Sequence, residues 1–241
     1  MFDNYFKTVL VTGAGGGIGR SISKLFSDHN WNVLCHYNSS EKKIHELEQY
    51  FINNNCNYHL LKCDFSDREQ VECFIDELDK FEINSLINNA GTFIKSNNNL
   101  MQIIELFMVN VFLPMLISVN IFEKMKQNNF GRIVNISSIG AKYGSNFLSM
   151  PYGCSKLALE GTTKTLSREG SKYNILVNTI RPGIIDTDFH QKSSKDMSQR
   201  ISMIPLNKMG KPEDISKMAY YLGSEKNNFI TNDIITISGG E

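Results

Sequence analysis

Tyr152 and Lys156 are the first pair in this chain whose types and spacing could carry out chemistry. They stand four residues apart, so on a helix they would share one face about one turn apart. A phenol beside an ammonium group has its anionic form favoured, which lowers its pKa from about 10 toward the range of useful acid–base catalysis. Such a phenol suits proton transfer to or from a carbinol oxygen during hydride transfer. The spacing by itself is weak, because most such pairs are ordinary exposed neighbours on a helix.

A second set of polar residues favours the same site. The letters NNAG at 88–91 close an apolar run, Asn110 follows, and Ser138 comes just after the apolar run at 132–136. Each of these falls near the C-terminal end of a predicted strand or in the helix after it. Ligands of open α/β sheets bind at that edge, so the order of these residues favours a site over scattered turn and cap residues.

Five glycines crowd the segment Thr12–Arg20. Their spacing misses the G-x-G-x-x-G pattern, yet a strand precedes them and an amphipathic helix with Ile18 and Ile22 on one face follows at once. A helix N-terminus there presents free N–H groups and the positive end of a dipole to a pyrophosphate. Glycines let the backbone approach such a ligand without an obstructing Cβ. A phosphate-binding turn is therefore favoured over a flexible linker.

Short β-branched runs alternate with segments of helical period along the chain. We predict strands at 8–11, 32–37, 58–63, 85–87, 132–136, 175–180 and 234–237. One helix should follow Ser66 or Asp67 as its N-cap, and another should run from Pro212 to a C-cap at Gly223. The alternation predicts an α/β fold, a Rossmann-type doubly wound parallel sheet of about seven strands with helices on both faces. No linker divides residues 1–241, so we expect a single dinucleotide-binding and catalytic domain.

The composition narrows the class of protein. Lys plus Arg and Asp plus Glu balance at 25 each, which does not point to nucleic acid or an anionic membrane. We find no basic and apolar leader, and no apolar run near the roughly 18 residues of a membrane helix. The five cysteines form no CxxC pair, and the five histidines have no metal-ligand spacing. We therefore expect a cytoplasmic protein with reduced thiols, no metal, and no nucleic-acid or membrane partner.

Together these motifs resemble the single-domain short-chain dehydrogenase/reductase family from Lys7 to Gly240. The stretches that carry the resemblance are TGAGGGIG, CD at Cys63-Asp64, NNAG, Asn110 in MVN, GRIVNISS, YGCSK, RPGIIDT and the closing ISGG. Two further stretches, SREGSKYNILVNTIRPG and PEDISKMAYYLGS, are most similar to the β-ketoacyl-acyl-carrier-protein reductase branch of that family.

The resemblance implies a division of labour among four catalytic residues. Tyr152 would be the general acid in ketone reduction, and Lys156 would lower its pKa and hold the nicotinamide ribose. Ser138 would hydrogen-bond the substrate carbonyl, and Asn110 would anchor a water in a proton relay. Ser137 stays open as an alternative to Ser138, because Ser138 lies 14 residues before Tyr152 where one residue fewer is common.

The resemblance also implies the cofactor contacts. Gly13, Gly17, Ile18 and Gly19 would line the pyrophosphate turn, Asp64 and Phe65 would flank the adenine, Asn89, Ala90 and Gly91 would contact the adenosine ribose, and Pro182, Gly183 and Thr187 would border the nicotinamide, with Tyr152 and Lys156 reaching the same cofactor. The segment between Gly91 and Asn110 is a few residues shorter than in many relatives, which leaves the substrate side open. Phe189, His190, Met197, Met203 and Met209 fall where the family has a mobile lid.

The end of the second predicted strand bears on which nucleotide binds. NAD enzymes of this fold usually carry Asp or Glu there, to hold the ribose hydroxyls. This chain has no acid between His36 and Glu41, so Asn38, Ser39 and His36 could donate hydrogen bonds to a 2′-phosphate. Against NADP, Gly16 stands where NADP-preferring relatives often have a basic residue. We expect NADP(H) to be preferred, with NAD(H) possible.

These observations predict an NADP(H)-dependent oxidoreductase that reduces a carbonyl by hydride transfer, with Tyr152 as the proton donor. The carbonyl would belong to a β-ketoacyl thioester or a small ketone, free or bound to a carrier. The alternatives are an NAD-dependent alcohol or sugar dehydrogenase and, from another class, a non-catalytic cofactor-binding regulator. The intact set of Ser138, Tyr152, Lys156 and Asn110 argues against a regulator. By resemblance the protein would be a homotetramer or dimer.

Overall fold

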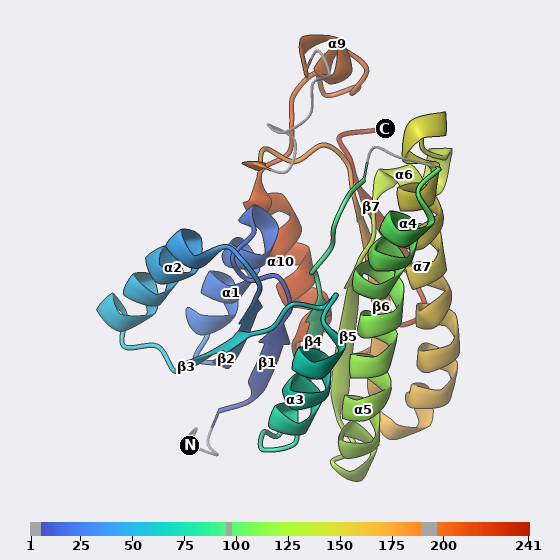
Figure 1. The fold of residues 1–241 in the computed structure, drawn as a ribbon. Helices are drawn as coiled ribbons and strands as arrows, with labels where there is room; N and C mark the ends of the chain where they lie inside the picture. Colours follow the sequence, from blue (N-terminus) through green and yellow to red (C-terminus); the bar gives the residue numbers. More distant parts are fainter. Residues whose placement is uncertain (1–5, 95–97, 189–196) are drawn as a thin grey trace.

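A parallel sheet forms the centre of the computed structural model, which describes residues 6–94, 98–188 and 197–241 (Figure 1). Its strands are β1 (Thr8–Val11), β2 (Asn32–Tyr37), β3 (Tyr58–Lys62), β4 (Ser85–Asn88), β5 (Gly131–Ile136), β6 (Ile175–Pro182) and β7 (Ile234–Ile237). They lie in the order β3-β2-β1-β4-β5-β6-β7, and every neighbouring pair is parallel. The predicted doubly wound sheet of seven strands is confirmed.

Helices bury both faces of the sheet. Successive residues of each strand point to opposite faces, so both sets of side chains are mostly apolar. In β1, Val9 and Val11 join one hydrophobic cluster, and Leu10 between them joins the other. Helices α1 (Gly17–Ser27), α2 (Glu41–Asn53) and α10 (Pro212–Gly223) cover the first face (Figure 1).

The second face is covered by α3 (Arg68–Leu78), by one long helix, and by α7 (Met150–Gly170) (Figure 1). The long helix consists of α4 (Leu100–Phe107), the π-helical turn η1 (Met108–Phe112) and α5 (Leu113–Gln127). The remaining described elements are short: α6 (Ile139–Tyr143), η2 (Phe147–Ser149), η3 (Ser171–Tyr173) and α9 (Met197–Ser202). Of the residues expected in a lid, Phe189 and His190 lie outside the described part of the chain.

Three of the predicted helix ends can be compared with the structure. Asp67, rather than Ser66, is the N-cap of α3, and its carboxylate accepts hydrogen bonds from the amides of Glu69 and Gln70. The helix α10 begins at Pro212 as predicted, but Gly223 is its last residue and Ser224 is the C-cap.

The long helix α4–η1–α5 requires a correction. By length and composition Leu100–Gln127 could cross a membrane, although the sequence analysis found no run of that kind. The error came from counting uninterrupted apolar residues, whereas scattered polar residues such as Asn110 still leave the average apolar. One such helix is weak evidence for a membrane span, and 33% of its most apolar window is buried inside the chain.

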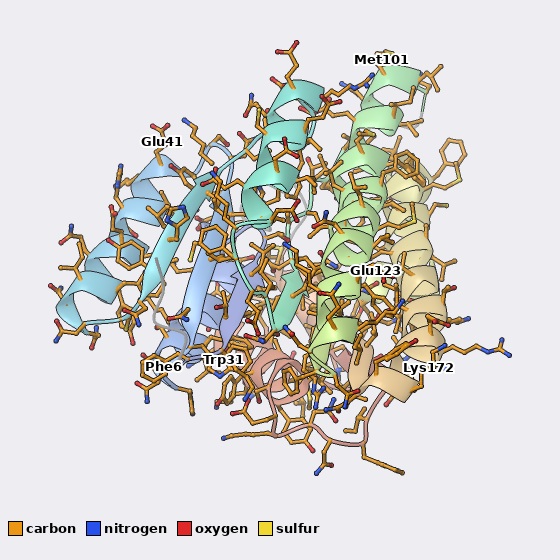
Figure 2. The ribbon with its side chains drawn as sticks, turned by 90° about the horizontal axis from the view of Figure 1, so that it is seen from below. Phe6, Trp31, Glu41, Met101, Glu123 and Lys172 are labelled. Carbon is orange, nitrogen blue, oxygen red and sulfur yellow. The ribbon has the colours of Figure 1, made fainter. Side chains whose placement is uncertain are left out.

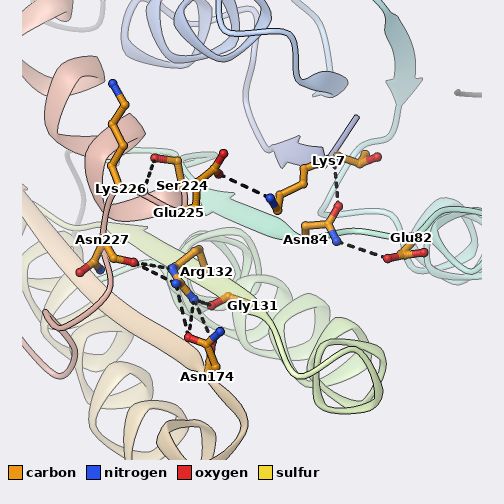
Figure 3. Close-up of polar contacts among 11 residues, drawn as sticks. Lys7, Glu82, Asn84, Gly131, Arg132, Asn174, Ser224, Glu225, Lys226 and Asn227 are labelled. Carbon is orange, nitrogen blue, oxygen red and sulfur yellow. Dashed lines mark hydrogen bonds and ion pairs between the residues drawn. The ribbon is translucent and has the colours of Figure 1, made fainter. Parts of the chain in front are cut away.

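Arg132 connects segments at the amino-terminal ends of the strands (Figure 3). Its side chain is 2% exposed. The guanidinium donates to the carbonyl of Asn227 at 2.9 and 3.1 Å, and to those of Gly131 and Asn174 at 2.8 Å each. Burial lowers the pKa of Arg132 to about 10, so it stays charged at neutral pH. One cation thus ties β5 to the turn before β6 and the loop before β7.

Candidate active site

The four residues predicted to be catalytic come from three neighbouring elements. Ser138 follows β5, Tyr152 and Lys156 lie in the first two turns of α7, and Asn110 lies in η1. Pro151 occupies the first turn of α7, where its missing N–H costs nothing, and so it helps begin the helix just before Tyr152. The fold brings these four residues together, as predicted.

Tyr152 is the residue whose environment differs most from expectation. Burial raises the pKa of its phenol, and a hydrogen bond with Ser138 offsets only part of that rise. The ring of Phe93 meets the ring of Tyr152 edge-on, with centroids 5.1 Å apart. The phenol is therefore protonated at neutral pH, in the form that can donate a proton.

The pKa of Tyr152 is raised in this structure, whereas the neighbouring Lys156 was expected to lower it. The Lys156 ammonium nitrogen lies 6.0 Å from the centroid of the Tyr152 ring and donates to the carbonyl of Ile136 at 3.0 Å. Burial lowers the pKa of Lys156 to about 8, because removal from water disfavours the charged form. Spacing alone could not show that burial dominates both groups.

The choice between Ser137 and Ser138 follows from where each hydroxyl is bonded. The Ser137 hydroxyl is buried and donates to Glu160 at 2.6 Å. Glu160 comes after Lys156 in α7, whereas Tyr152 comes before it. The Ser138 hydroxyl interacts with Tyr152 and accepts from the amide of Gly140 at 3.1 Å as the N-cap of α6. The geometry therefore favours Ser138 as the group beside the phenol.

Asn110 lies in a π-helical turn, a feature often found at functional sites. Its side chain is fully buried and joins two segments of the site. The amide oxygen accepts from the N–H of Thr92 at 2.8 Å, while the amide nitrogen donates to the Thr92 carbonyl and to Ser155, each at 3.0 Å. Asn110 thus fixes the segment after NNAG against α7.

The glycine-rich turn fits a pyrophosphate. No side chain caps the N-terminus of α1, which begins at Gly17 directly after the turn, so its first amides can bind an anion. A Cβ on Gly19 would lie 2.2 Å from the carbonyl oxygen of Gly13, and one on Gly17 would lie 2.5 Å from a methyl of Thr187. Gly13 itself has φ +68, which other residues rarely adopt. Ile18 follows in the first turn of the helix.

The predicted ribose contacts lie directly beside this turn. The side-chain amide of Asn89 donates to the carbonyls of Thr12 and Gly13, at 2.9 and 3.1 Å. The Thr12 hydroxyl in turn accepts from the amides of Asn89 and Ala90, at 3.0 Å each. A Cβ on Gly91 would lie 3.2 Å from the Lys156 nitrogen, so this segment connects the glycine turn to the catalytic residues.

The predicted nicotinamide border lies at the end of β6. Gly183 packs so closely on Ser238 that a Cβ would lie 2.7 Å from its Cα, and its amide donates to Ile237 at 2.8 Å. Pro182 before it is buried, and Thr187 after it contacts Gly17. The residues expected to touch the two ends of a nicotinamide dinucleotide are therefore brought to one edge of the sheet.

His36 is unavailable to a 2′-phosphate, which corrects the suggestion that it could donate to one. It is 3% exposed, and its Nε2 bonds the carbonyl of Cys63 at 3.0 Å while Nδ1 accepts from the amide of Gly13 at 3.2 Å. Because a carbonyl only accepts, Nε2 carries the proton. The ring stacks on Phe65 with centroids 3.9 Å apart, so the two rings pack together behind the glycine turn.

The remaining predicted adenosine contacts are more accessible. Asn38 and Ser39 are exposed at the end of β2. Asp64 is half-buried after β3, and its carboxylate accepts from the amide and hydroxyl of Ser66, at 2.8 and 2.7 Å. These hydrogen bonds, the amide's first, lower the pKa of Asp64. The part of the chain that the structure describes has no cluster of three or more potential metal ligands.

His36 predicts a specific acid sensitivity. Burial lowers its pKa to about 4 from 6.5, so between these values the unfolded chain binds more protons than the folded one. The free energy of unfolding should therefore fall by about 3 kcal/mol as the pH drops through this window, at 1.36 kcal/mol per unit. Urea unfolding of wild type and His36→Gln across the window measures this. Equal pH slopes for the two proteins would contradict it.

Three residues of the site were missed by sequence reasoning. Phe93 contacts Tyr152, Thr12 locks the NNAG segment to the glycine turn, and Glu160 accepts from Ser137. The position of Phe93, two residues after NNAG, was an available signal for the first. The other two depend on contacts between distant segments.

The chain is similar in sequence to members of a known family. The profile of the family described as short chain dehydrogenase matches residues 7–198. The 3-oxoacyl-acyl-carrier-protein reductase of Rickettsia conorii is 33% identical, and the alignment covers 100% of this chain and 98% of that protein.

Solved structures show the same fold. The structure of ElxO with NADP bound has a TM-score of 0.86 at 30% identity and covers 98% of each chain. The structure of YwfH, an NADPH-dependent reductase involved in bacilysin biosynthesis, has a TM-score of 0.88 at 26% identity, again over 98% of each chain.

Proposed function

Because this chain belongs to the short-chain dehydrogenase family, we propose that it is an NADP(H)-dependent reductase of a carbonyl group. The observation that carries the proposal is the contact between the Ser138 hydroxyl and the buried, protonated phenol of Tyr152. The cofactor supplies the hydride. The residues of this chain supply the proton and the orientation of the substrate.

Each catalytic residue has a defined task in this proposal. Ser138 donates a hydrogen bond to the substrate carbonyl oxygen, and Tyr152 gives that oxygen its proton as the alcohol forms. Lys156, whose ammonium already faces Gly91 and the Ile136 carbonyl, holds the ribose of the nicotinamide. Asn110 keeps the segment after NNAG in place and anchors a water for the proton relay.

The NADP(H) preference is supported by the end of β2. Asn38 and Ser39 are exposed there, and the segment from His36 to Ser40 contains no carboxylate that would repel a 2′-phosphate. Two of the similar solved structures are described as NADP-bound or NADPH-dependent. The glycine turn of residues 13–19 would hold the pyrophosphate that both nucleotides share.

Gly16 offers a direct test of this preference. Its φ of −76 suits any residue, and a Cβ there would meet nothing nearer than the Gly13 carbonyl oxygen at 3.4 Å. Gly16→Arg should therefore raise the ratio of kcat/KM with NADPH to that with NADH by about tenfold, the effect of one added interaction of 1.4 kcal/mol with a phosphate. Gly16→Ala, which adds the Cβ without the charge, should leave the ratio unchanged. An unchanged ratio in both would show that the 2′-phosphate binds elsewhere.

The substrate class is proposed from the relatives. The chain is similar over its full length to a 3-oxoacyl-acyl-carrier-protein reductase, so β-ketoacyl thioesters are the first substrates to assay, followed by small ketones. The experiment measures NADPH and NADH oxidation by the wild type with acetoacetyl thioesters and a ketone panel. A protein that binds the cofactor but reduces none of them would favour the non-catalytic regulator. Faster oxidation of alcohols or sugars with NAD would favour the alternative dehydrogenase.

We also propose that residues 1–241 act as one domain of a cytoplasmic homo-oligomer, a tetramer or dimer. The support is an apolar surface on the long helix and α7, which lie side by side (Figures 1 and 2). The exposed side chains there include Phe112, Met115, Leu116, Val119 and Leu157, each 44–54% exposed. A second copy would cover them.

Leu116→Glu should reduce the size of the assembly. It places a charge in the middle of the apolar surface, where pairing would bury it without a partner. Sedimentation of wild type and variant measures the mass, with Asp76→Lys on the exposed side of α3 as the control. A monomeric wild type, or a variant of unchanged mass, would refute this interface.

A further inference from the structure

The buried carboxylate of Glu160 lies one helical turn beyond Lys156 and two beyond Tyr152, on the same side of α7. It is 2% exposed, and both of its oxygens are occupied. One oxygen accepts from the Ser137 hydroxyl and from Nε of Arg181, at 2.6 Å each. The other accepts from Nη2 of Arg181, also at 2.6 Å.

These contacts bind α7 to the ends of two neighbouring strands. Ser137 follows β5, and its amide donates to the carbonyl of Ile180 in β6 at 2.8 Å. Arg181 is in β6 itself, directly before Pro182 and Gly183. The Glu160–Arg181 pair therefore lies next to residues proposed to contact the cofactor, through the position of Arg181 directly before Pro182.

Three consecutive residues after and at the end of β5 each contact a different residue of α7. The Ile136 carbonyl accepts from Lys156, the Ser137 hydroxyl donates to Glu160, and the Ser138 hydroxyl interacts with Tyr152. The other contact of the Ser137 hydroxyl, with the Lys156 carbonyl, is long at 3.4 Å. The central contact with Glu160 thus sets how this tripeptide is turned against the helix.

A buried ion pair is weak as a source of stability, since apolar residues of similar volume often do as well or better. What the Glu160–Arg181 pair adds is direction, because a bidentate guanidinium fixes the plane of the carboxylate that receives Ser137. We propose that Glu160, oriented by Arg181, is a positioning residue of the active site. It acts through Ser137 to hold Ser138 and the Ile136 carbonyl in register with Tyr152 and Lys156, and this inference rests on the proposed reductase function.

The test compares three variants with wild type. Glu160→Leu combined with Arg181→Met replaces the pair by apolar side chains, so thermal stability should be retained while kcat falls by about 10- to 100-fold. Ser137→Ala keeps the ion pair but removes the link, and should lower kcat by about tenfold. Glu160→Gln, whose amide oxygen can still accept a hydrogen bond from Ser137, should keep most of the wild-type activity. In all three, NADPH binding measured by the fluorescence of the bound nucleotide should match wild type.

Glu169→Gln is the matched control, because Glu169 is exposed on the same helix and bonds only Lys172 among the ion pairs recorded for the described residues. Wild-type kcat in both Ser137→Ala and the folded double variant would overturn the inference. If the double variant does not fold, Ser137→Ala decides alone. Failure of the proposed function is distinguishable, since wild type itself would then reduce no carbonyl, or Tyr152→Phe would be as active as wild type.

Discussion

Tyr152→Phe is expected to reduce kcat for carbonyl reduction by about 10³-fold, within the range that one general acid contributes. The variant loses the phenol proton that the site holds beside the Ser138 hydroxyl. Phenylalanine keeps the ring, so the edge-on contact with Phe93 and the packing of the helix should survive. NADPH affinity and thermal stability should change little, which separates lost chemistry from lost structure.

Tyr143 provides the matched control for this variant. It is a tyrosine of the neighbouring helix α6, but it is 61% exposed. Tyr143→Phe should therefore have wild-type kcat. Steady-state NADPH oxidation with the best substrate of the panel measures both variants. Full activity of Tyr152→Phe would show that another group donates the proton.

Arg132→Met is expected to lower the free energy of unfolding by about 4 kcal/mol. The substitution removes the donor from the carbonyls of Gly131, Asn174 and Asn227. Gly131 and Asn227 are buried, and each buried group left without a partner costs about 1–3 kcal/mol. Arg132 lies at the start of β5 and Ser138 follows its end, so kcat of the folded fraction should be unchanged.

Urea unfolding measures this loss, and Arg68→Met is the control. The Arg68 side chain is 90% exposed and pairs with Glu72 on the surface of α3, an interaction worth little. Its removal should cost less than about 0.5 kcal/mol. A similar small loss for Arg132→Met would mean that water or a rearranged loop satisfies the three carbonyls.

The strands could be predicted from the sequence because each is a short, β-branched run buried on both faces. The strand that was placed least well is β6, which continues through Arg181 to Pro182 instead of ending at Ile180. Arg181 and Pro182 look like a break in the sequence, yet they pair with Thr236 and Ile237 of β7. That pairing depends on a segment more than 50 residues away, which local pattern cannot reveal.

The site divides in the same way. Ser138, Tyr152, Lys156 and Asn110 could be named as candidates because each lies in a short motif that resembles the family. The directions of the pKa shifts of Tyr152 and Lys156 could not be predicted, because burial by other segments outweighs the neighbouring charge. His36 also misled the sequence reasoning, since nothing local shows that Gly13 and Cys63 occupy both of its nitrogens.

The π-helical turn at Met108–Phe112 has a consequence beyond the placement of Asn110. A π turn holds one residue more than an α turn, so it rotates everything after it by about 100° relative to a continuous helix. Ile104 is exposed, and about seven residues on an uninterrupted helix would again expose position 111. Instead Val111 is 7% exposed and Phe112 is 44% exposed.

The extra residue therefore rotates α5 about its axis, so that its exposed apolar residues continue those on α4. The proposed role of Asn110 and the proposed pairing surface therefore depend on the same insertion, because this turn buries Asn110 and leaves Phe112 exposed. Removing one residue from the turn would have two effects at once: it would move Asn110 out of the site and rotate the exposed apolar residues of α5. Length changes at this position should therefore be tolerated far less than substitutions on the helix surface.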